Sequence, residues 1–197
     1  NCVPVITQSG KYSAKRLKPA PAPGAVTFTL TADDIIRWRW LSGEALIVNQ
    51  VDFRYDWNLA DNPDFWSKRQ LYTFDQGTPN SVNRYGKQPP LVIESKGIKT
   101  TQGGQTILDD RAFLVGKRFA EPPRILEVEV FYSKHIADIL DPAKVTHAKI
   151  PNLKTGLRGL TNEVFEIIDL RPLFLDEGRV VLALMHTGAI TLPSAPS

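Results

Sequence analysis

Residues 48–57 read Val-Asn-Gln-Val-Asp-Phe-Arg-Tyr-Asp-Trp, and the prediction of a mainly β fold starts from them. Apolar and polar side chains alternate along it, as in a β-strand with one buried face. The turn-rich residues 58–64 come next, and residues 65–74 then have the character of a return strand. The apolar side chains of the first strand are Val51, Phe53, Tyr55 and Trp57. The sequence therefore predicts a β-hairpin in this part of the chain.

The same alternation predicts further strands on both sides of the hairpin. Turn residues rich in glycine, proline and acids separate several of them. The predicted strands are residues 26–30, 91–94, 125–132, 144–150, 162–170 and 178–186. About eight strands and few helices indicate a mainly β fold with α+β character, built from antiparallel sheets or as a barrel-like β-domain.

Two or three helices are predicted. Two of them are placed by a threonine that stands three residues before an aspartate, at Thr31 and again at Thr106. The first is a short helix at 32–41. The second, near 106–119, is amphipathic, with one apolar stripe. That stripe consists of Leu108, Ala112, Val115 and Phe119. We expect it to pack on the sheet that contains Leu126, Val128 and Val130.

Proline-rich segments bound the predicted folded body. Residues 18–24 read Lys-Pro-Ala-Pro-Ala-Pro-Gly, which favours an extended conformation because proline lacks a backbone donor. We predict an N-terminal extension and linker at 1–24, a β-rich body at 25–191 and a C-terminal linker at 192–197. If the body has two small subdomains, their boundary is expected near 98–123. Linkers at both ends indicate a piece of a larger protein.

The composition is that of an ordinary globular protein, with 42% hydrophobic and 23% charged residues among 197. No apolar run approaches the roughly 20 residues of a membrane-spanning helix. The net charge of +3 is dispersed, so we predict neither a membrane span nor a specific nucleic-acid partner. Lys15, Arg16 and Lys18 form the one compact basic group, which we interpret as part of a solvated linker. The single cysteine, Cys2, excludes an internal disulfide.

Signatures of catalysis and metal binding are missing from the sequence. The three histidines, His135, His147 and His186, lie in no zinc-binding or nucleophile motif. Neighbouring acids could serve glycoside hydrolysis, but those at 33, 34, 109 and 110 are interpreted as first-turn helix residues. The other acidic pairs are Glu127 with Glu129, on the polar side of a strand, and Asp176 with Glu177, in a turn. We predict no catalytic residue, no metal ligand and no cofactor.

Tryptophans suggest a second possible function. Trp38, Trp40 and Trp66 could form an aromatic surface that stacks on sugars, whereas Trp57 belongs to the apolar side of its strand. A carbohydrate-binding or adhesion β-domain is therefore the alternative to a purely structural protein, and a hydrolase is a third.

The order of the segments carries a resemblance to a known family. Asp33-Asp34-Ile35, the strand from residue 48 to 55, Ser81-Val82-Asn83-Arg84-Tyr85-Gly86 and the helix near 106–119 follow one another. This series is similar to domains of bacteriophage tail hub and tail tip proteins. One departure is Leu140-Asp141-Pro142, where such proteins often have a Gly-Asp pair.

The resemblance implies a structural, non-enzymatic component of a tail tip or baseplate hub, joining the tail tube to distal parts. It implies other tail proteins and further copies of the chain, in a ring, as partners. The chain would be found in the virion after synthesis in the bacterial cytoplasm. The residues expected to determine the fold are Asn49, Tyr55, Ser81, Tyr85 and Gly86.

Overall fold

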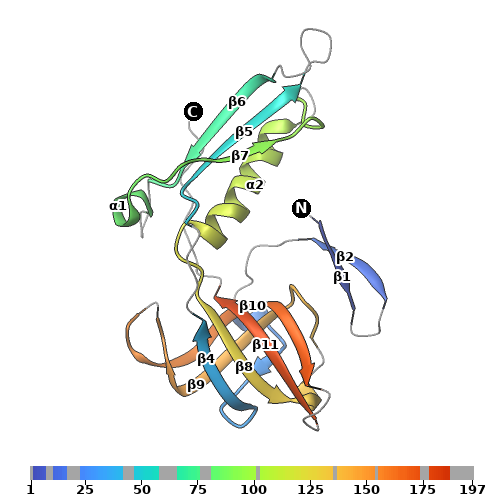
Figure 1. Cartoon of the computed structure of the whole chain (residues 1–197), viewed down its shortest axis with the longest axis vertical. Helices are drawn as coiled ribbons and strands as arrows, with labels where there is room; N and C mark the ends of the chain where they lie inside the picture. The colour runs from blue at the N-terminus through green and yellow to red at the C-terminus, as the bar shows by residue number, and fades with distance from the viewer. Residues whose placement is uncertain are drawn as a thin grey trace. The chain divides into compact units, whose positions relative to one another are not determined.

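A computed structural model describes residues 2–7, 11–16, 23–41, 47–57, 66–75, 81–100, 103–134, 137–153, 155–173 and 178–186 (Figure 1). Strands predominate and one helix is long, in agreement with the predicted fold class. Contacts divide the chain into two units. Unit 1 comprises Asn1–Glu44 and Pro123–Gly188, and unit 2 comprises Ala45–Pro122 and Ala189–Ser197. Among the described residues, no helix is both long and apolar enough to cross a bilayer.

Unit 1 is built on a six-stranded sheet in the order β3-β9-β10-β11-β8-β4. Neighbouring strands are antiparallel except for the short parallel pair β3–β9. The sheet is strongly curled in Figure 1. Two single turns, η1 (Pro23–Ala25) and η3 (Tyr132–Lys134), accompany it. The strands are β3 (Thr29–Leu30), β4 (Ile35–Leu41), β8 (Ile125–Phe131), β9 (Pro142–Pro151), β10 (Arg158–Leu173) and β11 (Arg179–His186).

Alternation within these strands produces the core of unit 1. In β8 every second residue is buried, and the polar residues between them face outward. The core includes Leu126, Val128, Val130, Phe165, Ile167, Leu182 and Leu184, each at most 1% exposed. Burial of one such side chain stabilises the fold by about 1.5–3 kcal/mol, so this cluster holds the curled sheet together.

Unit 2 is a three-stranded sheet, order β6-β5-β7, packed against one long helix. β5 and β6 form the predicted antiparallel hairpin, and β7 is parallel to β5. Val51, Phe53 and Tyr55 of β5 pack with Leu108 and Ala112 of the helix. The elements are β5 (Gln50–Trp57), β6 (Trp66–Thr73), α1 (Ser81–Tyr85), β7 (Leu91–Glu94) and α2 (Gly104–Phe119).

The prediction of a helix at 32–41 is wrong, because residues 35–41 form strand β4. The threonine and aspartate that suggested a helix start do bond to each other: Thr31 N and Oγ1 both donate to Asp34 Oδ2 at 2.8 Å. These bonds close a turn, since Asp34 N also donates to Thr31 O. The chain then enters the strand, and the alternation of arginine and tryptophan at 37–40 is a strand pattern.

The predicted partner of helix α2 is also wrong. All four residues of its apolar stripe belong to the core of unit 2, whereas Leu126, Val128 and Val130 belong to the core of unit 1. The boundary between the units falls between Pro122 and Pro123, just after the helix. The strand next in sequence therefore builds a different core, and the helix packs on the β5 sheet that precedes it.

Residues expected to form an N-terminal extension contain a β-hairpin. Strands β1 (Cys2–Ile6) and β2 (Tyr12–Arg16) pair antiparallel, with Pro4 opposite Ala14. Ile6 and Tyr12 face each other across the hairpin and are 60% and 90% exposed. Such a two-stranded sheet is marginally stable by itself.

Gly116 gives a first prediction, because it lies inside α2 against the ring of Phe74. A Cβ at position 116 would lie 2.5 Å from Phe74 Cζ, and Phe74 is only 3% exposed. Alanine is better than glycine in a helix interior by about 1 kcal/mol, yet Gly116→Ala is expected to destabilise unit 2 by about 1–3 kcal/mol because of this overlap. Urea unfolding measures the change.

The control is the same substitution in a Phe74→Leu background, where the blocking ring is gone. There Gly116→Ala should cost less than in the native background. A more stable Gly116→Ala protein in the native background would contradict the packing.

Candidate interaction surfaces

Asn49 joins the start of β5 to the loop after α1 in unit 2. Its side chain is fully buried; Nδ2 donates to Gly86 O at 2.7 Å, and Oδ1 accepts from Gln88 N at 3.0 Å. Gly86 has φ +72°, in the left-handed region that favours glycine. One side chain thus holds both ends of a tight loop.

The other residues of the predicted motif lie in the same unit. Ser81 is 2% exposed, and its hydroxyl donates to Ala120 O at the end of α2. Tyr55 is buried in the core between sheet and helix. Tyr85 is half-buried, and its carbonyl accepts a hydrogen bond from Gln88 Nε2 at 2.9 Å. The side chains of Asn49 and Ser81 therefore bond backbone groups distant in sequence.

Asn49→Ala is expected to destabilise unit 2 by about 1–3 kcal/mol, because it leaves Gly86 O and Gln88 N without their partner. Amide hydrogen exchange at Gln88 should become faster. The amide of Val128, in unit 1, serves as the internal control and should keep its rate. Unchanged exchange at Gln88 would show that the loop does not depend on Asn49.

The three tryptophans predicted to form an aromatic surface are not equally exposed to solvent. Trp38 is 37% exposed, whereas Trp40 is half-buried and its indole Nε1 donates to Pro151 O at 3.1 Å. Trp66 is half-buried and lies in unit 2, paired in register with Trp57. Within unit 1, Trp38 is thus the tryptophan available for contact, and Trp40 supports the core.

Arginines cover two glutamates on the outer face of the six-stranded sheet. Glu127 Oε1 accepts from Arg39 Nε and Oε2 from Arg171 Nη2, each at 2.6 Å. Glu129 accepts from Arg179 Nη1 at 2.8 Å, and Arg37 Nε lies 4.0 Å away. We call Arg37, Arg39, Arg171 and Arg179 the arginine face. The glutamates are 12% and 13% exposed, so these arginines compensate carboxylates that are largely removed from water.

The hydrogen bond from Arg39, followed by that from Arg171, holds the pKa of Glu127 below its usual value of 4.5. A carboxyl whose pKa is depressed in the folded state adds stability above the unfolded-state pKa, and this stability is lost as the pH falls through the folded pKa. Glu127→Gln should therefore reduce the loss of stability on acidification below pH 4.5. Urea midpoints across that pH range test this, and an unchanged pH slope would contradict it.

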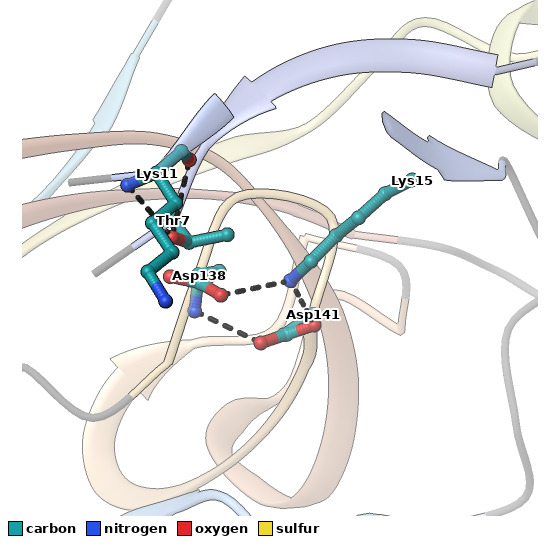
Figure 2. A network of polar contacts seen from close by, with 5 residues as sticks. All are labelled: Thr7, Lys11, Lys15, Asp138 and Asp141. Atoms are coloured by element: carbon teal, nitrogen blue, oxygen red, sulfur yellow. Dashed lines mark hydrogen bonds and ion pairs between the residues drawn. The ribbon is translucent and has the colours of Figure 1, made fainter. Parts of the chain in front are cut away.

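A second ionic cluster in unit 1 involves the N-terminal hairpin. Figure 2 shows Lys15 Nζ between the carboxylates of Asp138 and Asp141, at 3.3 and 2.7 Å. The backbone N–H of Asp138 donates to Asp141 Oδ2, which fixes the two acids together. The interpretation of Lys15 as a solvated linker residue is therefore wrong. The side chains of Arg16 and Lys18 lie outside the described part of the chain.

His147 and His186 have structural partners. His186 Nε2 lies 3.0 Å from Glu163 Oε2, and His147 Nδ1 accepts from Lys149 N. Among the described residues, no group of three histidine, cysteine, aspartate or glutamate side chains could hold a metal ion. His135 and the pair at 176–177 lie outside those residues.

The reading of four acids as first-turn helix residues is wrong. Asp33 and Asp34 lie in the turn before β4, and Asp34 pairs with Lys134 at 3.0 Å. Helix α2 begins at Gly104, so residues 109 and 110 fall beyond its first turn. Asp109 Oδ1 instead accepts from Tyr72 Oη at 2.5 Å, and burial together with this bond raises the pKa of Tyr72. Asp109 therefore links the helix to the sheet.

Comparison with known proteins identifies the fold. No protein-family model and no curated protein sequence matches the chain. The tail protein from Neisseria meningitidis MC58 superposes with a TM-score of 0.52 at 12% identity, over 93% of this chain and 50% of that one. The chain shares its fold with this protein and spans half of its length.

Two further solved structures are similar at lower TM-scores. The 43 kDa tail protein of prophage MuSo2 from Shewanella oneidensis has a TM-score of 0.42 at 16% identity, over 93% of this chain and 50% of that one. Prophage tail protein gp18 from Listeria monocytogenes EGD-e has a TM-score of 0.40 at 10% identity, over 81% of this chain and 43% of that one.

Proposed function

We propose that the chain is a structural, non-catalytic part of a bacteriophage tail. The observation that carries the proposal is the shared fold with the Neisseria tail protein over 93% of the chain. Fold alone does not determine function, so the proposal requires a test in particles.

The finer proposal is that the chain belongs to the tail tip or baseplate hub, where it joins the tube to distal receptor-binding or penetration parts. It contacts other tail proteins and copies of itself in a ring. It resides in the virion after synthesis in the host cytoplasm. The alternative, a sugar-binding surface, gains no support from the half-buried Trp40 and Trp66.

Mass spectrometry of purified tailed particles tests the tail role, with gold-labelled antibodies locating the chain. Peptides of the chain should be present at a fixed ratio to the major tail proteins, and label should gather at the distal end of the tail. Label elsewhere along the tail would contradict the hub position but not the tail role. Absence from particles, with the protein abundant in the lysate, would contradict both.

Measurement of the molecular mass in solution tests whether a ring forms. The 197-residue chain, of 22.0 kDa, spans half the length of the Neisseria tail protein, and we expect it to be monomeric at micromolar concentration because a closed ring depends on repeated contacts between subunits. The full product of the gene should form a closed oligomer. A strictly monomeric full product with tight sugar binding would favour the adhesion module.

A further inference from the structure

The arginine face has more donors than its own carboxylates use. Arg37 and Arg39 remain 78% and 68% exposed although both lie beside glutamates. A guanidinium has five N–H donors, and Arg39 is shown bonding Glu127 through Nε. Arg37, at 4.0 Å from Glu129, is the least engaged. The outward sides of these two groups are therefore open to another acceptor.

Arg39 and Arg171 are also held in position before any partner arrives. Arg39 bonds Glu127 on β8, which in turn bonds Arg171 on β10, so three strands fix the orientation of the guanidinium planes. A side chain that is already ordered loses less conformational entropy on binding. Beside them lies a hollow of about 270 Å³ that is lined by Arg37, Trp38, Arg39, Glu127, Glu129 and Val181.

The spacing of the two exposed arginines matches an extended chain. Arg37 and Arg39 are two residues apart on one face of β4, because they stand opposite Glu129 and Glu127 in the register. Side chains two apart on a strand are separated by about 7 Å. Acidic residues at alternate positions of an extended segment have the same separation, so two carboxylates could contact both arginines together.

We propose that the arginine face and its hollow bind an extended segment of a neighbouring protein subunit that carries aspartate or glutamate at alternate positions. Arg37 and Arg39 receive the carboxylates. That the partner is a neighbouring protein subunit rests on the proposed tail role. The binding chemistry itself is independent of that role.

Nucleic acid fits this surface less well than an acidic peptide. Three carboxylates, those of Glu127, Glu129 and Asp169, lie among the four arginines, and Asp169 pairs with Arg171 at 2.9 Å. The net local charge is therefore +1. Binding to a phosphate backbone depends on many uncompensated lysines and arginines. The carboxylates at the hollow would repel a continuous row of phosphates, whereas acids at alternate positions can be directed to the arginines.

Fluorescence anisotropy of a labelled ten-residue peptide of alternating glutamate and threonine tests the proposal on the intact chain at low salt. We expect saturable binding that weakens as salt is added, because exposed charges are screened. A lysine–threonine peptide of the same length should not bind. Tighter binding of a ten-nucleotide oligothymidine than of the acidic peptide would overturn the proposal in favour of nucleic acid.

Two variants localise the binding. Arg37→Glu, at the arginine whose Nε lies 4.0 Å from Glu129, should lower the affinity at least tenfold, and Arg39→Ala should lower it similarly. Arg158→Ala, an exposed arginine of the same sheet outside the hollow, should change it less than twofold. If circular dichroism shows that Arg39→Ala is unfolded, Arg37→Glu decides. Equal affinities for wild type and Arg37→Glu, or no binding at all, would overturn the proposal without affecting the particle test of the tail role.

Discussion

Phe165→Ala is expected to destabilise unit 1 by about 3–5 kcal/mol. Phe165 is fully buried in the centre of the six-stranded sheet. Its ring centroid lies 4.9 Å from that of His186 and 6.3 Å from that of Trp40. Removing the ring deletes apolar contacts on both sides and leaves a cavity. This is one of the two largest effects that we expect from a single substitution.

The reporter for this experiment is the fluorescence of Trp38 and Trp40, in a background where Trp57 and Trp66 are replaced by phenylalanine. Urea unfolding then reports on unit 1. Leu157→Ala, at a side chain 69% exposed, is the matched control and should change the stability by no more than about 0.5 kcal/mol. A loss below about 1 kcal/mol for Phe165→Ala would show that this ring is not central to the core.

Phe53→Ala is expected to have a similar effect, about 3–5 kcal/mol, in unit 2. Phe53 is fully buried on β5, and its ring meets that of Tyr72 edge to face, with centroids 5.7 Å apart. Leu71, on β6 of the same sheet, is 42% exposed and provides the matched control, since Leu71→Ala should have a small effect. Trp57 and Trp66 report on this unit when Trp38 and Trp40 are replaced by phenylalanine.

Together the two substitutions test the division into units. We expect Phe53→Ala to shift the transition seen by Trp57 and Trp66 more than that seen by Trp38 and Trp40, and Phe165→Ala to do the reverse. Equal shifts at both pairs of tryptophans, for both variants, would indicate one cooperative core rather than two.

The sequence predicted those elements whose local pattern had one physical meaning. The β5–β6 hairpin was predictable because alternation over residues 51–57 fits a strand and a turn-rich segment follows. Strand β4 was not, because a threonine three residues before an aspartate can close a turn as well as start a helix. At residues 37–40, the alternation of arginine with tryptophan was the signal that could have corrected the prediction.

Contacts between residues far apart in the sequence could not be predicted from local patterns. The stripe of α2 was correctly identified, but a stripe does not specify which of two sheets covers it. The arginine face was missed for the same reason, since Arg39 and Arg171 reach Glu127 from 88 and 44 residues away. Lys15 likewise meets Asp141 across 126 residues of sequence. Strand register places Arg39 opposite Glu127, whereas Lys15 comes from a separate two-stranded sheet.

Electron microscopy of particles from a phage that lacks the gene for this chain tests whether the chain is a structural part of the tail. If the chain is a structural part of the tail, the deletion should yield heads without complete tails, and a plasmid copy of the gene should restore them. An adhesion module at the tail end would instead leave tails of normal form that fail to attach to cells. Complete, normal tails in the deletion mutant would contradict the structural role proposed for this chain.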